Sequence, residues 1–144
     1  MPRQTVLKNE FTYFKEVHTR WMDNDTYGHV NNVVYYSYFD TLVNSYLIEK
    51  GGLDIQTGDQ IGFIVNSNCE YQQSVAFPEI LHGGLKVARI GTSSVDYALA
   101  LFKEGNDLAC AFGAMTHVFV DRATNEPSPI RGQLRDALEA IYTK

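Results

Sequence analysis

The 144-residue sequence has few cysteines, few basic residues and no long apolar segment. Its two cysteines, Cys69 and Cys110, form no C-x-x-C pair, so the sequence predicts neither a zinc site nor a thioredoxin-like motif. Twelve Lys and Arg stand against 17 Asp and Glu, and the net charge of -5 argues against nucleic acid as a partner. An anionic ligand would therefore need a local cationic patch.

Targeting and membrane signals are also missing from the pattern. No segment approaches the roughly 20 apolar residues of a membrane span, and the first ten residues lack the apolar stretch of a signal peptide. We therefore expect a cytoplasmic protein with reduced thiols and no membrane contact. The length predicts a single domain, residues 1–144, and nine Tyr and eight Phe predict a core filled by large rings.

The hydrophobic pattern predicts one long helix, one short helix and five strands. Residues 32–50 contain no Pro or Gly, and Gly51-Gly52 then gives a stop signal, which predicts a helix of about five turns. Alternation of apolar and polar residues predicts the strands, and breaks at Pro78 and Gly83-Gly84 limit them. The predicted strands are 14–21, 61–72, 84–91, 94–103 and 108–120, and a short helix follows around 134–141.

These elements predict an α+β fold in which an antiparallel meander covers one helix. Short connections between long strands favour antiparallel pairing. The helix carries apolar side chains over a wide arc, which is typical of a helix enclosed by other structure. Because such a sheet leaves its edges and one face uncovered, we expect the chain to form a homodimer.

Residues 23–32, D-N-D-T-Y-G-H-V-N-N, carry the most unusual chemistry of the chain. Gly28 is expected to adopt a backbone conformation that other residues disfavour, and Asn31 is suited to cap the helix that follows. Asp25 would lie near the free amides and positive dipole of the helix N-terminus, ready to act as base or nucleophile. The same amides can polarise a carbonyl, so the loop predicts an acyl-transfer site.

The loop also contains part of a calcium-binding pattern. Asp23, Asp25 and Gly28 fit positions 1, 3 and 6 of an EF-hand loop. Tyr27 and Val34 then occupy positions 5 and 12, where oxygen ligands are required, so a calcium loop is excluded. Carboxylates beside one histidine in a turn are usually local hydrogen-bond acceptors, and we expect no transition metal there.

The pattern D-x-D-x-x-G-H-V-N-N-x-x-Y, with G-x-x-S and a final V-F-V-D downstream, resembles the hot-dog-fold acyl-CoA thioesterases of the 4-hydroxybenzoyl-CoA thioesterase-like family. The resemblance covers roughly residues 12–142. It implies an antiparallel sheet of five or six strands wrapped around a long central helix, homodimers joined edge to edge that often pair into homotetramers, and an active site at the subunit interface. It also implies hydrolysis of an acyl-CoA to a free acid and CoA, without a cofactor because CoA is part of the substrate.

The resemblance also implies roles for single residues. Asp25 matches the catalytic carboxylate, which either activates water or attacks to give an anhydride. Asn32 matches the position whose backbone N–H polarises the thioester carbonyl, while Gly28 and Asn31 shape that helix end. The H-V-N-N segment departs from the 4-hydroxybenzoyl-specific pattern and is more similar to the branch that acts on aliphatic or general acyl-CoA substrates.

Because CoA is anionic, the acidic chain needs local positive charge near the substrate. Lys86 and Arg89 are candidates for contacts with pantetheine or phosphate, although both also fit the pattern of solvated strand residues. His29 is a candidate for contact with substrate or partner, or a local hydrogen-bonding group. The candidate substrate-binding residues are His29, Asn31, Tyr35, Lys86, Arg89, Thr92, Ser93 and Ser94.

Two other functions remain open at this point. A hot-dog hydratase or dehydratase normally pairs a catalytic histidine with a carboxylate, and His29 keeps this alternative in play. A non-catalytic acyl-CoA-binding module would use the same cleft without turnover. The intact Asp25 speaks against it, since pure binding needs no carboxylate beside an anionic ligand.

Overall fold

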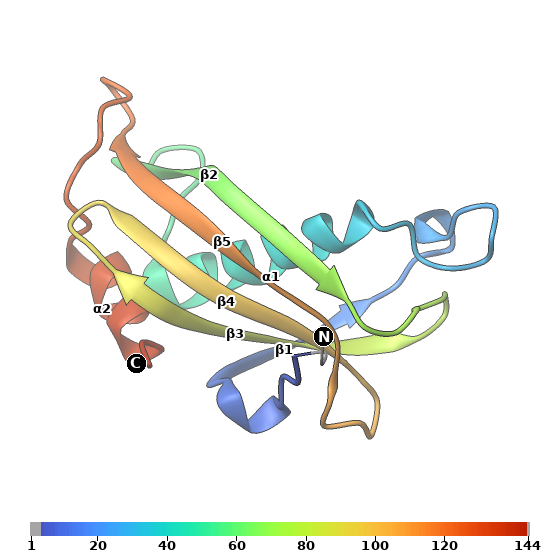
Figure 1. Cartoon of the computed structure of the whole chain (residues 1–144). Coiled ribbons are helices and arrows are strands. Elements are labelled where there is room, and N and C mark those ends of the chain that lie inside the picture. Colours follow the sequence, from blue (N-terminus) through green and yellow to red (C-terminus); the bar gives the residue numbers. More distant parts are fainter. Residues whose placement is uncertain (1–3, 144) are drawn as a thin grey trace.

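A five-stranded antiparallel sheet curves around one long helix in the computed structural model, which describes residues 4–143 (Figure 1). The strand order is β1-β3-β4-β5-β2, so β1 and β2 form the two edges. The elements in chain order are β1 Tyr13–His18, α1 Val34–Gly51, β2 Gln60–Tyr71, β3 Ile80–Ile90, β4 Ser94–Lys103, β5 Ala109–Asp121 and α2 Gly132–Ala140, with short 3-10 turns at Lys8–Glu10 and Trp21–Asp23.

The strand pairing differs from a simple meander at β2. Strands β3, β4 and β5 pair with their sequence neighbours as predicted, but β2 pairs with β5 and not with β3. Residues 72–79 cross from one side of the sheet to the other to reach β3. Eight residues span this distance easily, because three strand spacings amount to roughly 14 Å.

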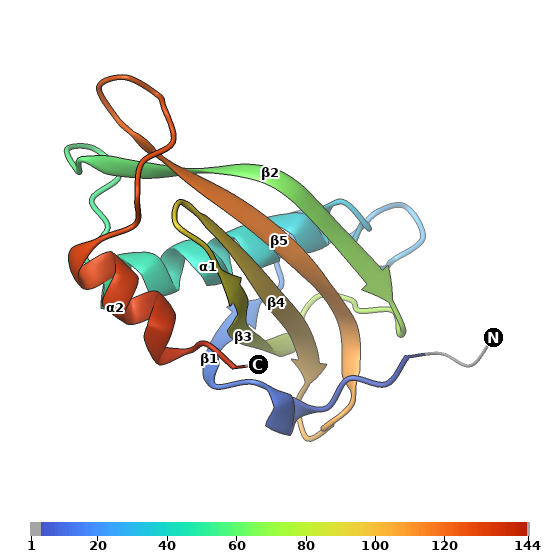
Figure 2. The same cartoon turned by 60° about the vertical axis from the view of Figure 1, so that its left-hand side comes forward.

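Helix α1 lies in the concave face of the sheet, and α2 packs beside it (Figure 2). Phe39, Leu42 and Val43 of α1 are fully buried against the strands, as its wide apolar arc predicts. The Tyr46 hydroxyl donates to the Ala137 carbonyl of α2 at 2.5 Å, which joins the two helices. The helix ends where predicted, since Gly52 adopts a left-handed conformation and its amide donates to the Leu47 carbonyl.

Strand β3 begins earlier than predicted, because Gly83 and Gly84 lie inside it and not in a turn. A Cβ atom at Gly83 would come within 2.9 Å of Leu42 Cδ2, on the face that carries α1. On the opposite face, a Cβ at Gly84 would come within 2.9 Å of the Phe11 ring. The two glycines therefore permit close approach on both faces of the sheet, and the predicted start at residue 84 was wrong.

A Gly83→Ala substitution is expected to lower the free energy of unfolding by about 1–2 kcal/mol, because the added methyl group overpacks the contact with Leu42. Urea denaturation of the wild-type and variant proteins measures the change. In a double-mutant cycle, Leu42→Val should recover part of the loss, since it removes the atoms in conflict. A Gly83→Ala protein as stable as the wild type would contradict this view of the packing.

The outer face and one edge of the sheet carry apolar residues as well. Val6 and Phe11 of the N-terminal segment pack over Phe102 on the outer face. Edge strand β2 leaves three consecutive apolar side chains exposed, namely Phe63, Ile64 and Val65.

The architecture confirms the predicted α+β hot-dog fold, with five strands around the central helix. None of the helices within residues 4–143 is both long and apolar enough to span a membrane.

Candidate active site

The loop between β1 and α1 is anchored by the carboxylate of Asp23, which is only 1% exposed. Its Oδ2 accepts hydrogen bonds from the Arg20 amide at 2.8 Å and from the Tyr38 hydroxyl at 2.6 Å. Its Oδ1 accepts from the Arg20 guanidinium at 2.9 Å. This turn ends β1 at His18, three residues before the predicted end, because the chain folds back around the carboxylate.

Burial and hydrogen bonding act on Asp23 in opposite directions. Burial alone would raise the pKa of its carboxyl group, but hydrogen bonds from Tyr38 and Arg20 outweigh it and hold the pKa below its ordinary value. The Asp23 carbonyl also accepts from the Asn31 amide at 2.9 Å. One ionised residue thus ties both ends of the loop to each other and to α1.

Asp25 lies in a tight turn that Gly28 closes. The Asp25 amide donates to the His29 carbonyl at 2.9 Å, and the Gly28 amide donates to the Asp25 carbonyl at 3.1 Å. Gly28 has φ +82°, which confirms the expected backbone conformation. The Asp25 Oδ1 atom accepts from the Tyr27 amide at 2.8 Å, which fixes the side chain within its own loop.

Helix α1 begins two residues later than the predicted start at residue 32, because residues 32 and 33 form a turn and not helix. The helix begins at Val34, so Asn31 is not its N-cap. Asn31 instead caps the preceding turn, where its Oδ1 accepts from the Val33 amide at 3.2 Å and its carbonyl accepts from the Val34 amide at 2.9 Å. Within residues 4–143, the amide of Asn32 has no acceptor, and it is therefore available to a ligand.

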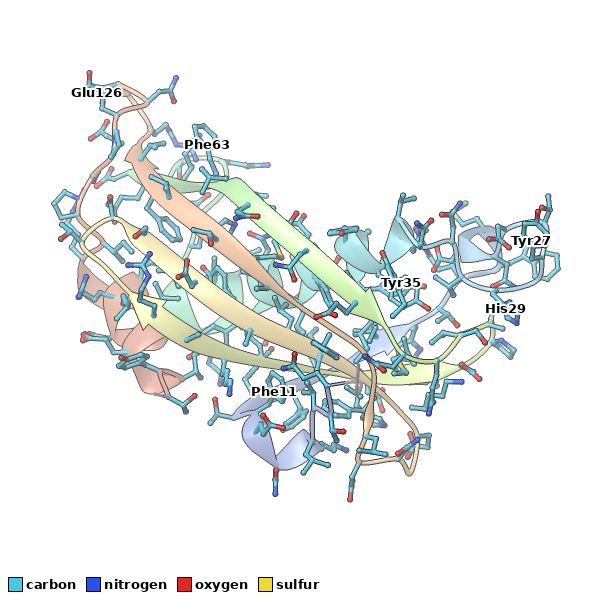
Figure 3. The ribbon with its side chains drawn as sticks, viewed as in Figure 1. Phe11, Tyr27, His29, Tyr35, Phe63 and Glu126 are labelled. Atoms are coloured by element: carbon cyan, nitrogen blue, oxygen red, sulfur yellow. The ribbon has the colours of Figure 1, made fainter. Side chains whose placement is uncertain are left out.

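Asp25 and Asn32 line the same cavity, which has a volume of about 370 Å³. Tyr35, buried on the first turn of α1, also lines it, and Figure 3 shows Tyr35 at the helix with His29 farther out on the loop. Burial raises the pKa of Tyr35 to about 12, so its hydroxyl stays neutral. The full lining is Asp25, Val30, Asn32, Tyr35, Tyr71, Gln72, Gln73 and Ser74.

The segment from Tyr71 to Ser74 was not predicted to be part of the site. Tyr71 ends β2, and its hydroxyl donates to the Asn32 carbonyl at 2.9 Å. Its ring meets the Tyr35 ring edge to face, with centroids 4.9 Å apart. No local motif marks this segment, since only the curvature of the sheet carries the end of β2 to the start of α1. An aromatic residue at the end of a predicted strand was the only available signal.

The other predicted substrate-binding residues lie elsewhere in this chain. His29 is exposed on the loop and does not line the cavity. Lys86 holds its ammonium group 5.4 Å from the Phe11 ring centroid on the outer face. Arg89 donates to Asp96 at 2.8 Å and to Ser94 at 3.1 Å.

Register places the 92–94 turn at the far end of the sheet from the cavity. Ser94 pairs with Val118, which pairs with Phe63, whereas the cavity lies at Tyr71. The separation along β2 is roughly 25 Å at about 3.3 Å per residue. A single chain therefore does not bring Thr92, Ser93 and Ser94 to Asp25. Within residues 4–143, no group of three or more His, Cys, Asp and Glu side chains is arranged to hold a metal ion.

Comparison with known proteins gives consistent matches over most of the chain. Residues 17–138 match the family model described as the thioesterase-like superfamily. The crystal structure of the PA5185 protein from Pseudomonas aeruginosa strain PAO1 is 54% identical, with a TM-score of 0.95 over 98% of this chain and 99% of that one. The DHNA-CoA thioesterase from Staphylococcus aureus is 22% identical, with a TM-score of 0.76 over 88% of this chain and 86% of that one, which shows a shared fold.

One curated relative is also similar in sequence. The uncharacterized protein YsmA of Bacillus subtilis (strain 168) is 28% identical over 122 residues. The match covers 83% of this chain and 80% of YsmA.

Proposed function

The chain belongs to the thioesterase-like superfamily, and from that premise we propose that it hydrolyses an acyl-CoA thioester to a free carboxylic acid and CoA. The observation that carries the proposal is that Asp25 and Asn32 line one cavity, so a carboxylate shares this cavity with a residue whose backbone amide has no acceptor within residues 4–143. Acyl transfer needs this combination, because the carboxylate supplies the base or nucleophile and the amide stabilises the oxyanion.

The reaction can follow either of two routes in this cavity. As a general base, Asp25 takes a proton from water while the water oxygen attacks the thioester carbon. The carbon–sulfur bond then breaks, and the proton passes to the CoA thiolate. As a nucleophile, the Asp25 carboxylate attacks the thioester carbon, the carbon–sulfur bond breaks, and CoA leaves as a thiolate that takes a proton from solvent. Water then hydrolyses the acyl anhydride, which releases the free acid and restores the Asp25 carboxylate. In both routes the Asn32 amide donates to the developing oxyanion.

A CoA ester is the favoured substrate class for two reasons. The pattern around Asp25 resembles acyl-CoA thioesterases, and the structurally similar Staphylococcus aureus protein is named as a CoA thioesterase. The cavity lining combines Val30 and Tyr35 with polar residues such as Gln72, as expected of a site that takes an acyl group attached to a polar carrier.

Thiol release from a panel of acyl-CoA esters of different chain length, with aromatic esters included, tests the proposal. We expect release of one thiol per ester hydrolysed. Hydration of an enoyl-CoA without thiol release would instead indicate a hydratase. Tight binding of CoA esters with no turnover across the panel would indicate a binding module.

We also propose a homodimer formed at the edge of β2. The exposed apolar run Phe63, Ile64 and Val65 lies on β2, which within residues 4–143 pairs with β5 alone, and it is a surface that a second copy can cover. If the β2 strands of two copies pair antiparallel about a two-fold axis, the two sheets run in opposite directions, and opposite ends of the two sheets lie on the same side of the dimer. The partner's 92–94 turn then lies on the same side as the Asp25 cavity, which would unite residues that one chain keeps apart.

An Ile64→Lys substitution is expected to convert the dimer into monomers, because a charge on an edge strand opposes pairing. Light scattering coupled to size exclusion should give a mass near 16.3 kDa for the variant and twice that for the wild type. Leu108→Lys is a matched control, since the two side chains are 45% and 44% exposed. Monomeric wild-type protein, or equal dissociation by both variants, would refute the β2 interface.

A further inference from the structure

Tyr71 makes a contact that the proposed reaction leaves unexplained. Its hydroxyl donates to the carbonyl of Asn32, the residue whose amide is the proposed oxyanion donor. In a regular helix that carbonyl would accept from the amide of Tyr36, but the Tyr36 amide donates to Val33 instead, at 3.3 Å. The Tyr71 side chain, from β2, thus replaces a backbone hydrogen bond at the start of α1.

The hydrogen bonds around Asn32 fix its backbone from both sides. The amides of Asn31 and Val33 are held by the Asp23 carbonyl and the Asn31 side chain. The carbonyl of Asn32 is held by Tyr71, and its own amide is the group that has no acceptor within residues 4–143. A change in the backbone torsions of Asn32 would turn its amide away from the thioester oxygen. The hydrogen bond from Tyr71 opposes that change.

We propose, on the basis of the proposed thioesterase function, that Tyr71 is a positioning residue that orients Asn32 so that its amide meets the thioester oxygen. Tyr71 acts through the Asn32 backbone and not on the substrate. The Tyr71 ring packs edge to face against the buried Tyr35 ring. This contact keeps the Tyr71 hydroxyl beside the start of α1. Burial and nearby groups raise the Tyr71 pKa, so the hydroxyl remains a donor at neutral pH.

The role predicts a specific kinetic pattern for Tyr71→Phe. The ring and its packing remain, and one donor is lost. We expect kcat to fall about tenfold, because the variant loses one hydrogen bond that holds the oxyanion donor in its orientation. KM should change by less than about twofold, because the orientation matters most when the oxyanion forms. The acid limb of the pH profile should stay in place, since Tyr71 transfers no proton in the proposed reaction.

Tyr142→Phe provides a matched control, because both tyrosines are 39% exposed and Tyr142 lies near the C-terminus, away from the cavity. It should leave kcat unchanged. If Tyr71→Phe keeps the wild-type kcat, loses activity only in step with a lower melting temperature, or shifts the acid limb, the positioning role is wrong.

Amide exchange gives a readout that does not depend on turnover. Hydrogen exchange at the Val33 and Val34 amides, measured by NMR, should accelerate in Tyr71→Phe and not in Tyr142→Phe, because both amides belong to the turn that Tyr71 fixes. If wild-type protein releases no thiol from any ester, the proposed function fails. The exchange rates would still test whether Tyr71 orients Asn32. Unchanged rates at both amides would overturn that role.

Discussion

An Asp25→Asn protein is expected to fold normally and to lose at least about 100-fold in acyl-CoA hydrolysis, because the base or nucleophile is removed. Asparagine keeps the shape of the side chain and an oxygen that can accept from the Tyr27 amide, so the turn should persist. Its amide group can neither take a proton from water nor form an anhydride. Thiol release under saturating ester, compared with the wild type, measures the loss in kcat.

Asp40→Asn separates this effect from a change in net charge. Asp40 is exposed on α1, where its carboxylate accepts from the Asn44 side chain, and it does not line the cavity. The control should retain wild-type turnover. Melting curves of both variants should match the wild type. Wild-type turnover in a folded Asp25→Asn protein would refute the assignment of Asp25 and leave the family membership intact.

Local patterns were sufficient for most of the elements. Alternation identified β4 and β5, and the absence of Pro and Gly up to Gly51 identified α1, because these signals depend on neighbours within one element. The start of β3 was wrong for a physical reason. Gly83 and Gly84 have the same local signature in a turn and in a strand that needs close approach, and only the position of Leu42 across the sheet distinguishes the two.

The candidate site divides in the same way. Asp25 and Asn32 belong to one short motif, and the structure places them around one cavity. Tyr71 enters from β2, 39 residues after Asn32, and its contribution depends on the pairing of β2 with β5. The anchoring of Asp23 by Tyr38 likewise crosses from a turn to a helix. Such contacts depend on tertiary packing and leave no periodic signal in the sequence.

A second large effect is expected from pH, through His117 of β5. This side chain is 3% exposed, and the Tyr97 hydroxyl lies 3.0 Å from its Nδ1 atom. Burial lowers the pKa of His117 to about 4 in the folded protein, from an ordinary value near 6.5 in the unfolded chain. Between these values the unfolded state binds the proton and the folded state does not, so acid favours unfolding.

The free energy of unfolding should therefore fall by about 3 kcal/mol as the pH drops from 6.5 to 4, at about 1.4 kcal/mol per pKa unit. Urea denaturation at a series of pH values measures the slope. His117→Gln should flatten it, because the amide can still accept from Tyr97 but does not titrate. Exposed His18 is the control, and His18→Gln should keep the wild-type slope. Asp23 acts in the same direction, and because its pKa is lowered in the folded protein, its contribution is lost as the pH falls below the ordinary aspartate value of about 3.9. An unchanged slope in His117→Gln would show that the folded protein accommodates a charged imidazole at this position. Burial of His117 would then not be what makes the fold sensitive to acid.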